Sequence, residues 1–306
     1  MYTFNITVTV DDEGRQLERH GTAAFPVVCN QGDLNGPEHY SVMCHWHDSF
    51  EIIFAHQGSI VVGADNSIET LNEGAGCFIN AGVLHSVRAA STDESVLRSI
   101  VFHPRVIGGI DTIFWQKYSR PLIENQNCRF ICFNVESERD REIIELMRDA
   151  WLAELEEAPG FEFEVRSLLS RLIFRIIEGA AGNEYTLTEG ELRDLDRLKT
   201  MITFIENNFA DNITLKQIAE TSSISEGECI RCFKRTTALP PMQFLKEFRL
   251  LRASELLRTT RLKIADIAER CGFLDMSYFA KSFKQLMSES PTDYRKNNLH
   301  QIIQQE

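Results

Sequence analysis

The chain has 306 residues, of which 43% are hydrophobic, and this size and composition are typical of a globular protein with two domains. No stretch approaches the roughly 20 apolar residues of a membrane span, and no basic segment followed by an apolar run marks a signal peptide, so neither a membrane protein nor an exported one is expected. The net charge of −13 disfavours nucleic-acid binding by the whole chain. Residues 195–306, however, hold 17 Lys and Arg against 14 Asp and Glu, whereas residues 1–194 hold 15 Lys and Arg against 31 Asp and Glu. A phosphate-binding surface is therefore expected only in the C-terminal third.

Residues 1–20 are polar and show no clear pattern, but a β pattern follows from 25 to 103. Its short apolar runs are Phe50–Ala55, Ile60–Val62, Cys77–Ile79 and Val96–Phe102, and glycines at 58, 63, 74, 76 and 82 separate them. Many short strands with glycine turns predict a barrel or a sandwich.

Histidines and a glutamate recur at fixed spacing in this region. The residues concerned are His45-Trp46-His47, Glu51 and Gly58, and then Gly74, Gly82 and His85. They resemble both halves of the cupin pattern, although Asn80 replaces a proline and Ala89 replaces an asparagine. The resemblance implies a small β-barrel.

The two histidines of the first half should face the same side, because alternate residues of a strand do so. His45 and His47 would then point into the barrel, where Glu51 and His85 can join them. Three imidazoles and one carboxylate suit a divalent transition metal such as Mn, Fe, Ni, Co or Zn. Two other interpretations stay open: the four groups, with Trp46, recognise an organic effector without a metal, or they only form structural hydrogen bonds.

A helical period replaces the β pattern between 137 and 179. Two apolar stripes, separated by Pro159-Gly160, predict two helices. They either cover one face of the barrel or present an apolar ridge to a second subunit, and the candidates for that ridge are Met147, Trp151, Leu168 and Leu172. Residues 181–195 are expected to form a linker, which gives an N-terminal domain of residues 1–180.

One motif occurs twice in the C-terminal third. Thr214-Leu215-Lys216-Gln217-Ile218-Ala219 leads to Phe233-Lys234, and Lys263-Ile264-Ala265-Asp266-Ile267-Ala268 leads to Phe283-Lys284, at offsets of 49 and 50. Each copy predicts a helix-turn-helix. Thr214 with Gln217, and Ser225 with Glu228, have the spacing of capping boxes, and the run Phe244–Thr259 predicts one long helix between the copies.

These segments resemble the AraC/XylS family of bacterial transcriptional regulators over residues 196–298. The specific matches are Phe248–Leu257, Ile264–Ala268, Gly272-Phe273, Ser277-Tyr278-Phe279 and Pro291–Arg295. The resemblance implies two helix-turn-helix units that read adjacent major-groove segments of double-stranded DNA, an effector domain and a homodimer. The family usually has glycine where the first recognition helix ends, whereas this chain has Ala238 there and Ser288 at the equivalent point of the second motif.

The outward faces of the two recognition helices supply the candidate DNA contacts. Arg231 is the best candidate for base reading, because a guanidinium can pair with guanine O6 and N7. Lys234 and Lys284 are expected at phosphates, which position the protein without specifying sequence. The remaining candidates are Glu226, Gly227 and Ile230 in the first helix, and Asp275, Met276, Ser277, Ala280 and Lys281 in the second.

Eight cysteines are expected to be reduced thiols of a cytoplasmic protein, because they lack the spacing of a disulfide scaffold. Cys229 and Cys232 have no second cysteine pair or nearby histidine to complete a zinc site, so core packing is favoured for them.

The sequence therefore predicts an α+β protein: a cupin-type barrel with flanking helices, then an all-α domain with two helix-turn-helix motifs and a tail at 299–306. The expected function is transcription regulation in response to a small effector, with carbohydrate as the first candidate from the family resemblance. RNA polymerase would be a further partner of an activator. The alternatives are a metal-dependent sensor and a metallo-cupin enzyme fused to a DNA-binding module, although no additional acid or base supports catalysis.

Overall fold

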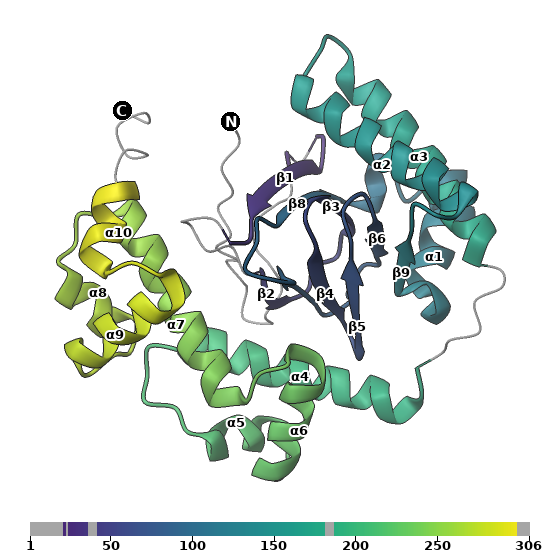
Figure 1. Ribbon diagram of the computed structural model, residues 1–306. Coiled ribbons are helices and arrows are strands. Elements are labelled where there is room, and N and C mark those ends of the chain that lie inside the picture. Colours follow the sequence, from purple (N-terminus) through teal and green to yellow (C-terminus); the bar gives the residue numbers. More distant parts are fainter. Residues whose placement is uncertain (1–20, 23, 36–41, 181–186, 299–306) are drawn as a thin grey trace. The chain divides into compact units, whose positions relative to one another are not determined.

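The computed structural model describes residues 21–22, 24–35, 42–180 and 187–298. They form two compact units, which divide between Arg193 and Asp194, inside helix α4 (Glu189–Asn208). The predicted α+β class, with a β-rich N-terminal domain and a helical C-terminal domain, is confirmed (Figure 1). The predicted tail at 299–306 and the N-terminal 20 residues lie outside the described residues.

Nine strands of the first unit form two antiparallel sheets. One sheet has the order β1-β8-β3-β6-β9 and the other has the order β2-β7-β4-β5, and the described strands do not join the two into one closed barrel. The strands are β1 (Val27–Asp33), β2 (Val42–His45), β3 (Phe50–Gln57), β4 (Ile60–Ala64), β5 (Ser67–Leu71), β6 (Gly76–Ile79), β7 (His85–Ala89), β8 (Val96–Phe102) and β9 (Phe130–Phe133).

Alternation along β3 divides the core of this unit into two layers. Ile53 and Ala55 join an apolar cluster with residues of both sheets, such as Val62 and Val87. The intervening side chains, Phe50, Ile52 and Phe54, belong to a second cluster with the helices. Glu51 has the parity of Ile53, so the backbone directs it into the interior between the sheets.

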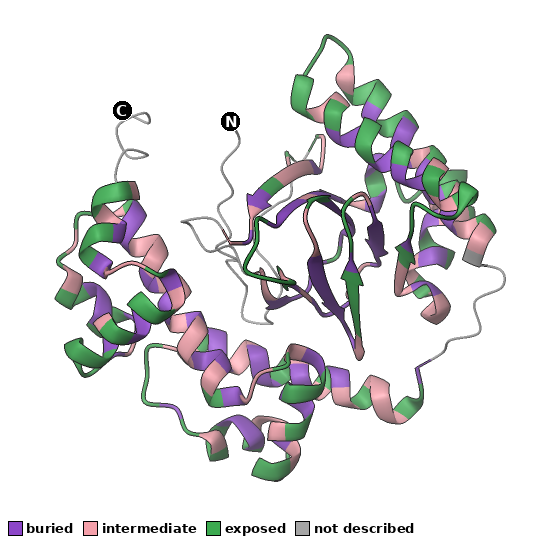
Figure 2. Ribbon diagram, in the orientation of Figure 1, coloured by how far each residue is buried: buried purple, intermediate pink, exposed green. Residues whose placement is uncertain are grey.

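Two long helices cover the outer face of the larger sheet: α2 (Glu138–Glu156) and α3 (Phe161–Ala180) (Figure 1). The predicted dimer ridge is wrong in this respect, because all four of its residues are buried in the chain's own core. These residues are Met147, Trp151, Leu168 and Leu172. Figure 2 shows that buried and exposed residues alternate along α2 and α3. Their periodicity marked an apolar face, and the sheet already covers that face.

The segment between β8 and β9 contains short helical turns that the sequence pattern did not predict. They are η1 (Pro104–Val106), a π-helical turn η2 (Trp115–Ser119), α1 (Arg120–Glu124) and η3 (Gln126–Cys128). They lead the chain from the end of β8 to the edge strand β9.

The predicted linker at 181–195 is too long. Helix α4 already begins at Glu189, and residues 181–186 lie outside the described residues. Thr188 Oγ1 accepts a hydrogen bond from the backbone N–H of Glu191 (3.2 Å), while the Glu191 carboxylate accepts one from the backbone N–H of Thr188 (2.8 Å). This reciprocal cap starts the helix at that point.

The second unit is helical from Asp194 onward. Its helices after α4 are α5 (Leu215–Thr221), α6 (Glu226–Thr237), α7 (Pro241–Thr259), α8 (Ile264–Arg270), α9 (Met276–Met287) and α10 (Pro291–Asn298). The predicted long helix between the two motifs is confirmed as α7, which packs against α5 and α6 on one side of the repeat and against α8, α9 and α10 on the other.

Local backbone geometry repeats between the two motifs. The Thr214–Gln217 capping box is complete, whereas Ser225 caps only the backbone N–H of Glu228. Ala238 and Ser288, which end the recognition helices α6 and α9, both adopt left-handed conformations with φ near +60° (59° and 58°). Both helices therefore end in the left-handed conformation that glycine usually provides, although this chain has alanine and serine at these positions.

Candidate functional site

Three histidines and one glutamate meet in the interior between the two sheets. His45 ends β2, His85 begins β7 and Glu51 lies on β3, while His47 follows β2 in the connection to β3. All four residues are buried, and one ligand atom of each lies within 4.8 Å of those of the other three. The four residues expected to converge thus do so, although His47 reaches the cluster from a connecting segment and not by alternation along a strand.

Backbone carbonyls orient all three imidazoles. The Nδ1 atoms of His45, His47 and His85 lie 2.9, 3.0 and 2.9 Å from the carbonyl oxygens of Met43, Ser49 and Val83. A carbonyl can only accept a hydrogen bond, so each Nδ1 carries the proton. The neutral rings then direct their Nε2 lone pairs away from the backbone, which is the arrangement that metal-binding histidines use.

The Nε2 atoms crowd the Glu51 carboxylate. His85 Nε2 lies 2.9 Å from Glu51 Oε2 without the geometry of a hydrogen bond, and His47 Nε2 lies 3.4 Å from the same oxygen. Lone pairs that converge at such distances in a buried site repel one another unless a cation or a proton lies among them. The donor set fits a divalent transition metal.

Electrostatics favour the protonation states that a metal requires. Burial is the main cause that lowers the pKa of His45 well below its ordinary value, and repulsion from His85 and His47 adds to it. Burial opposes ionisation of Glu51, but its contacts with His47 and His85 outweigh burial and hold the pKa of this carboxyl well below its ordinary value. Neutral imidazole and ionised carboxylate are the ligand forms.

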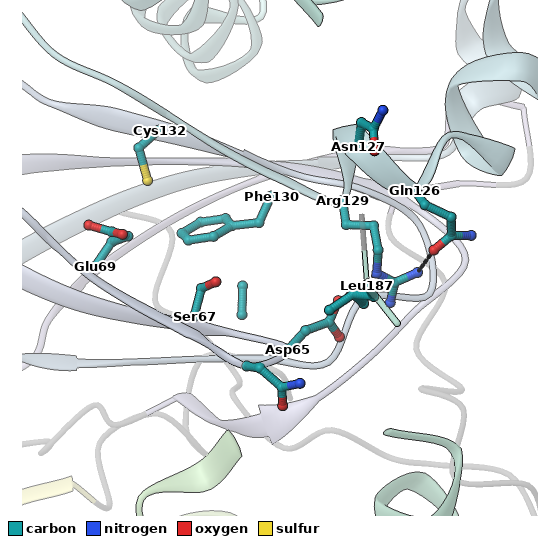
Figure 3. Close-up of a pocket in the computed structure, with 11 residues that line it drawn as sticks. Asp65, Ser67, Glu69, Gln126, Asn127, Arg129, Phe130, Cys132 and Leu187 are labelled. Atoms are coloured by element: carbon teal, nitrogen blue, oxygen red, sulfur yellow. Dashed lines mark hydrogen bonds and ion pairs between the residues drawn. The ribbon is translucent and has the colours of Figure 1, made fainter. Parts of the chain in front are cut away.

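A cavity of about 220 Å³ lies in the same domain, between the edge strands β5 and β9. Figure 3 shows Arg129 and Phe130 on one side of it and Asp65 and Ser67 across from them. The five predicted effector residues do not line it: the four residues of the histidine cluster and Trp46, which has 8% of its surface exposed, are all buried and absent from its wall. Segments 64–69 and 126–132, which form most of its wall, carry no motif that could have identified it.

Helix α6 directs the predicted contacts of the first recognition helix outward. Glu226, Gly227 and Lys234 are exposed, and Ile230 is half-buried. The Arg231 side chain is 70% exposed and its Nε donates to the Glu228 carboxylate (3.1 Å). The inward face holds Cys229, Cys232 and Phe233, so the two cysteines pack in the core.

Helix α9 presents a wider outward surface at its N-terminus. Met276, Ser277, Lys281 and Lys284 are exposed and Ala280 is half-buried, whereas the Asp275 carboxylate caps the helix by accepting from the backbone N–H of Tyr278 (2.7 Å). Leu274 and Tyr278, which sequence reasoning missed, are 94% and 53% exposed. An apolar group can contact a thymine methyl, so the apolar residues Leu274 and Tyr278 beside the predicted contacts were the available signal in the sequence.

Two sequence models of protein families match the chain. The family described as AraC-like ligand binding domain matches residues 33–173, and the one described as helix-turn-helix domain matches residues 218–297. In the residues that the structure describes, no helix is long and apolar enough to cross a membrane.

Several known proteins are similar to this chain over most of its length. The uncharacterized HTH-type transcriptional regulator YdeC of Bacillus subtilis is 22% identical over 94% of this chain and 98% of its own length. The HTH-type transcriptional activator RhaS of Shigella sonnei is 25% identical over 90% of this chain and 93% of its own length. Among solved structures, ToxT from Vibrio cholerae is 14% identical, with a TM-score of 0.46 over 89% of this chain and 98% of that one.

Proposed function

The chain belongs to the AraC family of transcriptional regulators, and from this premise we propose that it holds a divalent transition metal in its N-terminal domain and responds there to a small neutral effector, with carbohydrate as the first candidate. It is a DNA-binding regulator with an N-terminal ligand-binding domain, and its relatives are regulators and not enzymes. An effector can change DNA binding only through different affinities for two arrangements of the protein.

The observation that carries the metal is the orientation of the three imidazoles. Each Nδ1 lies against a backbone carbonyl, so the three Nε2 atoms and the Glu51 carboxylate face one another as the available ligand atoms. Residues His45, His47, Glu51 and His85 would hold the ion. A bound cation would remove the repulsion inside the cluster and fix the interior of the domain for effector binding.

Elemental analysis of the purified full chain tests the metal directly. About one transition-metal ion per chain is expected in the wild type and in the control His56→Ala, whose exposed imidazole lies outside the cluster, whereas His47→Ala and Glu51→Gln should lose it. Addition of the metal should raise the melting temperature of wild-type protein and leave both cluster variants unchanged. Absence of metal after reconstitution would leave the four side chains as a polar hydrogen-bonding cluster.

A metal sensor is the second candidate, and the same cluster favours it. In that case the DNA affinity of the full chain would change with the metal alone and would not respond to organic compounds. Titration of a promoter fragment with apo protein, metal-loaded protein and metal-loaded protein plus sugar separates the two candidates.

A homodimer is the third part of the proposal. Because the ridge is buried, the proposed contact surface is the outer face of α3. Phe163 and Phe174 are 80% and 46% exposed, and they are eleven positions apart, which places both on one side of the helix after three turns. Two large apolar side chains exposed on one side of a helix support an interaction surface there. Sedimentation of Phe163→Ser/Phe174→Ser against wild type checks it, because a surviving dimer would exclude this face.

The remaining partners follow from the role in transcription. Relatives named as activators support activation through contact with RNA polymerase. Free cysteines throughout the described chain support a reducing compartment such as the cytoplasm, where the promoter also lies.

A further inference from the structure

The open edges of the two sheets form a second site, separate from the histidine cluster. In one sheet, Ala64 pairs with His85 of the cluster and leads into the turn before β5. In the other sheet, Ile79 of β6 pairs with Glu51 on one side and with Phe130 on the other, so these two residues lie at the same level. The cavity of about 220 Å³ is therefore level with the cluster and lies nearer the edge strands. We infer that this cavity is the effector site, that it takes a neutral polyol of monosaccharide size, and that Leu187 in its wall conveys occupancy to helix α4 through the connector formed by Leu187 and Thr188.

The walls of the cavity are held in place by interactions between the two sheets. Arg129 Nε donates to Asp65 Oδ2 at 2.6 Å, and this pair joins the β4–β5 turn to the residue before β9, with side chains only 18% and 6% exposed. The backbone N–H of Asn80, which follows β6, donates to the carbonyl oxygen of Arg129 (2.9 Å), and this bond also holds the residue before β9 in place. Walls that are fixed before binding reduce the ordering cost of a ligand.

The charges of the lining favour a neutral ligand. Arg129 and Asp65 neutralise each other, and Glu69 adds a carboxylate that is not matched by a second cation among the lining residues. An anion would therefore meet a net negative wall. The amide side chain of Gln126 offers both donors and an acceptor, and Figure 3 shows the ring of Phe130 directed into the cavity. Hydroxyl groups can bond to the amide while a C–H face covers the ring.

The size of the cavity sets the size of the ligand. Pockets for drug-sized ligands occupy roughly 300–1,000 Å³. A cavity of about 220 Å³ is smaller than that range and leaves room for one sugar ring and not for an oligosaccharide.

Leu187 gives the cavity a route to the rest of the chain. It is 5% exposed, lines the cavity, and precedes Thr188, the residue that caps α4. From Asp194 onward α4 belongs to the DNA-binding unit. A ligand that packs against Leu187 changes the stability of this connector, and a ligand with that differential contact can shift the regulator between two arrangements.

The inference rests on the proposed function, and binding by the metal-loaded full chain tests it. D-Glucose, D-galactose and D-xylose are titrated by calorimetry, with D-glucuronate and D-galacturonate as anionic controls. At least one neutral sugar should bind, the uronates should bind more weakly, and Phe130→Ala should lose about tenfold in affinity while the control Ile113→Ala, at an apolar side chain that is 66% exposed, does not.

Several outcomes overturn the inference and leave the DNA-binding regulator and its proposed metal site standing. Binding that survives in Phe130→Ala but disappears in Glu51→Gln would place the effector on the metal. Uronates that bind as tightly as the neutral sugars, or no binding by any of the sugars, would contradict the assigned ligand class. Failure of the proposed function is seen separately, as absence of metal or of specific promoter binding in the wild type.

The connector is tested with Leu187→Ala and Leu187→Met. Leu187→Ala should retain sugar binding within a few-fold and lose the sugar-induced change in promoter affinity, whereas Leu187→Met, which preserves the apolar volume, should keep that change. An unaltered response in Leu187→Ala would exclude the connector as the route.

Discussion

The side-chain amide of Asn80 donates a 2.7 Å hydrogen bond to the carbonyl oxygen of Leu122. The same amide also donates to the carbonyl oxygen of Cys128 (3.2 Å), and all of these atoms are in the buried interior of the domain. Asn80 occupies the position where the cupin pattern has proline. The substitution ties the 122–129 segment, which carries part of the cavity wall, to the strand that ends at Ile79.

Asn80→Pro should therefore destabilise the protein although it restores the residue of the pattern. Proline removes the backbone N–H that donates to Arg129 and both side-chain donors, so a loss of about 3–5 kcal/mol in the free energy of unfolding is expected. Asn80→Ala keeps the backbone donor and should lose about 1–3 kcal/mol. Urea unfolding of both variants measures the difference, and equal losses would show that the backbone bond contributes little.

Glycine at the ends of the recognition helices should stabilise the protein. Ala238 and Ser288 hold left-handed conformations at which a β-carbon is unfavourable. Ala238→Gly and Ser288→Gly should each gain about 0.5–1 kcal/mol, less than the full conformational strain because glycine also makes the unfolded chain more flexible. Thermal unfolding measures both.

Gly272 supplies the matched control for that prediction. It has φ of +76°, and a β-carbon there would lie 2.8 Å from the carbonyl oxygen of Phe209. Gly272→Ala should cost about 2 kcal/mol or more. Ser223 is the corresponding residue of the first motif and also has a positive φ (53°), so Ser223→Gly is expected to stabilise. Destabilisation by glycine at all these positions would contradict the strain argument.

The stability of the chain should fall between about pH 5 and pH 8 because of Glu206. Burial raises the pKa of Glu206 to about 8, although Arg252 partly offsets the effect. A folded-state pKa above the unfolded one contributes stability at low pH, and this contribution is lost as the pH rises through the folded value, by at most about 1.4 kcal/mol per pH unit. Glu206→Gln should remove the slope in urea unfolding at pH 5, 6, 7 and 8, and parallel curves for the two proteins would disprove the assignment.

Arg231→Ala should weaken binding to a specific promoter more than binding to random DNA. The guanidinium must leave Glu228 to reach a base, and a bidentate contact with guanine contributes about 1–3 kcal/mol of discrimination. Lys234→Ala is the control, because a lost phosphate contact weakens both kinds of binding alike and reduces the salt dependence. Fluorescence anisotropy at two salt concentrations distinguishes the variants, and equal losses for Arg231→Ala would exclude base reading.

The elements of the C-terminal unit were accessible from sequence because their signals are local. Capping residues such as Thr214 and Ser225 fix helix starts within three residues, and the repeat supplies each motif with a second copy. The histidine cluster was accessible for a different reason: its spacing follows a known pattern, so the convergence of His45, Glu51 and His85 did not depend on deriving the topology.

Features that depend on tertiary contacts were not accessible. A helical stripe such as the one with Met147 and Leu168 shows which face is apolar, and only the structure shows that the sheet covers it. The cavity is lined by both Ser67 and Phe130, which are 63 residues apart in the sequence, and no local sequence pattern predicts that they lie close together. The start of α4 was visible in Thr188 and Glu191, which form a capping box inside a segment whose composition favoured a linker.

Helix α7 makes the geometry of the protein a constraint on the promoter. Its 19 residues extend about 28 Å, and both helix-turn-helix motifs pack against this one rod. The two recognition helices cannot adjust their separation without breaking those contacts. A base substitution in the DNA removes one contact, whereas one inserted base pair between the two recognition segments turns one of them by about a tenth of a helical turn and shifts it by 3.4 Å along the axis. Promoters of this regulator are therefore expected to tolerate base substitutions within each recognition segment far better than insertions or deletions between the two segments.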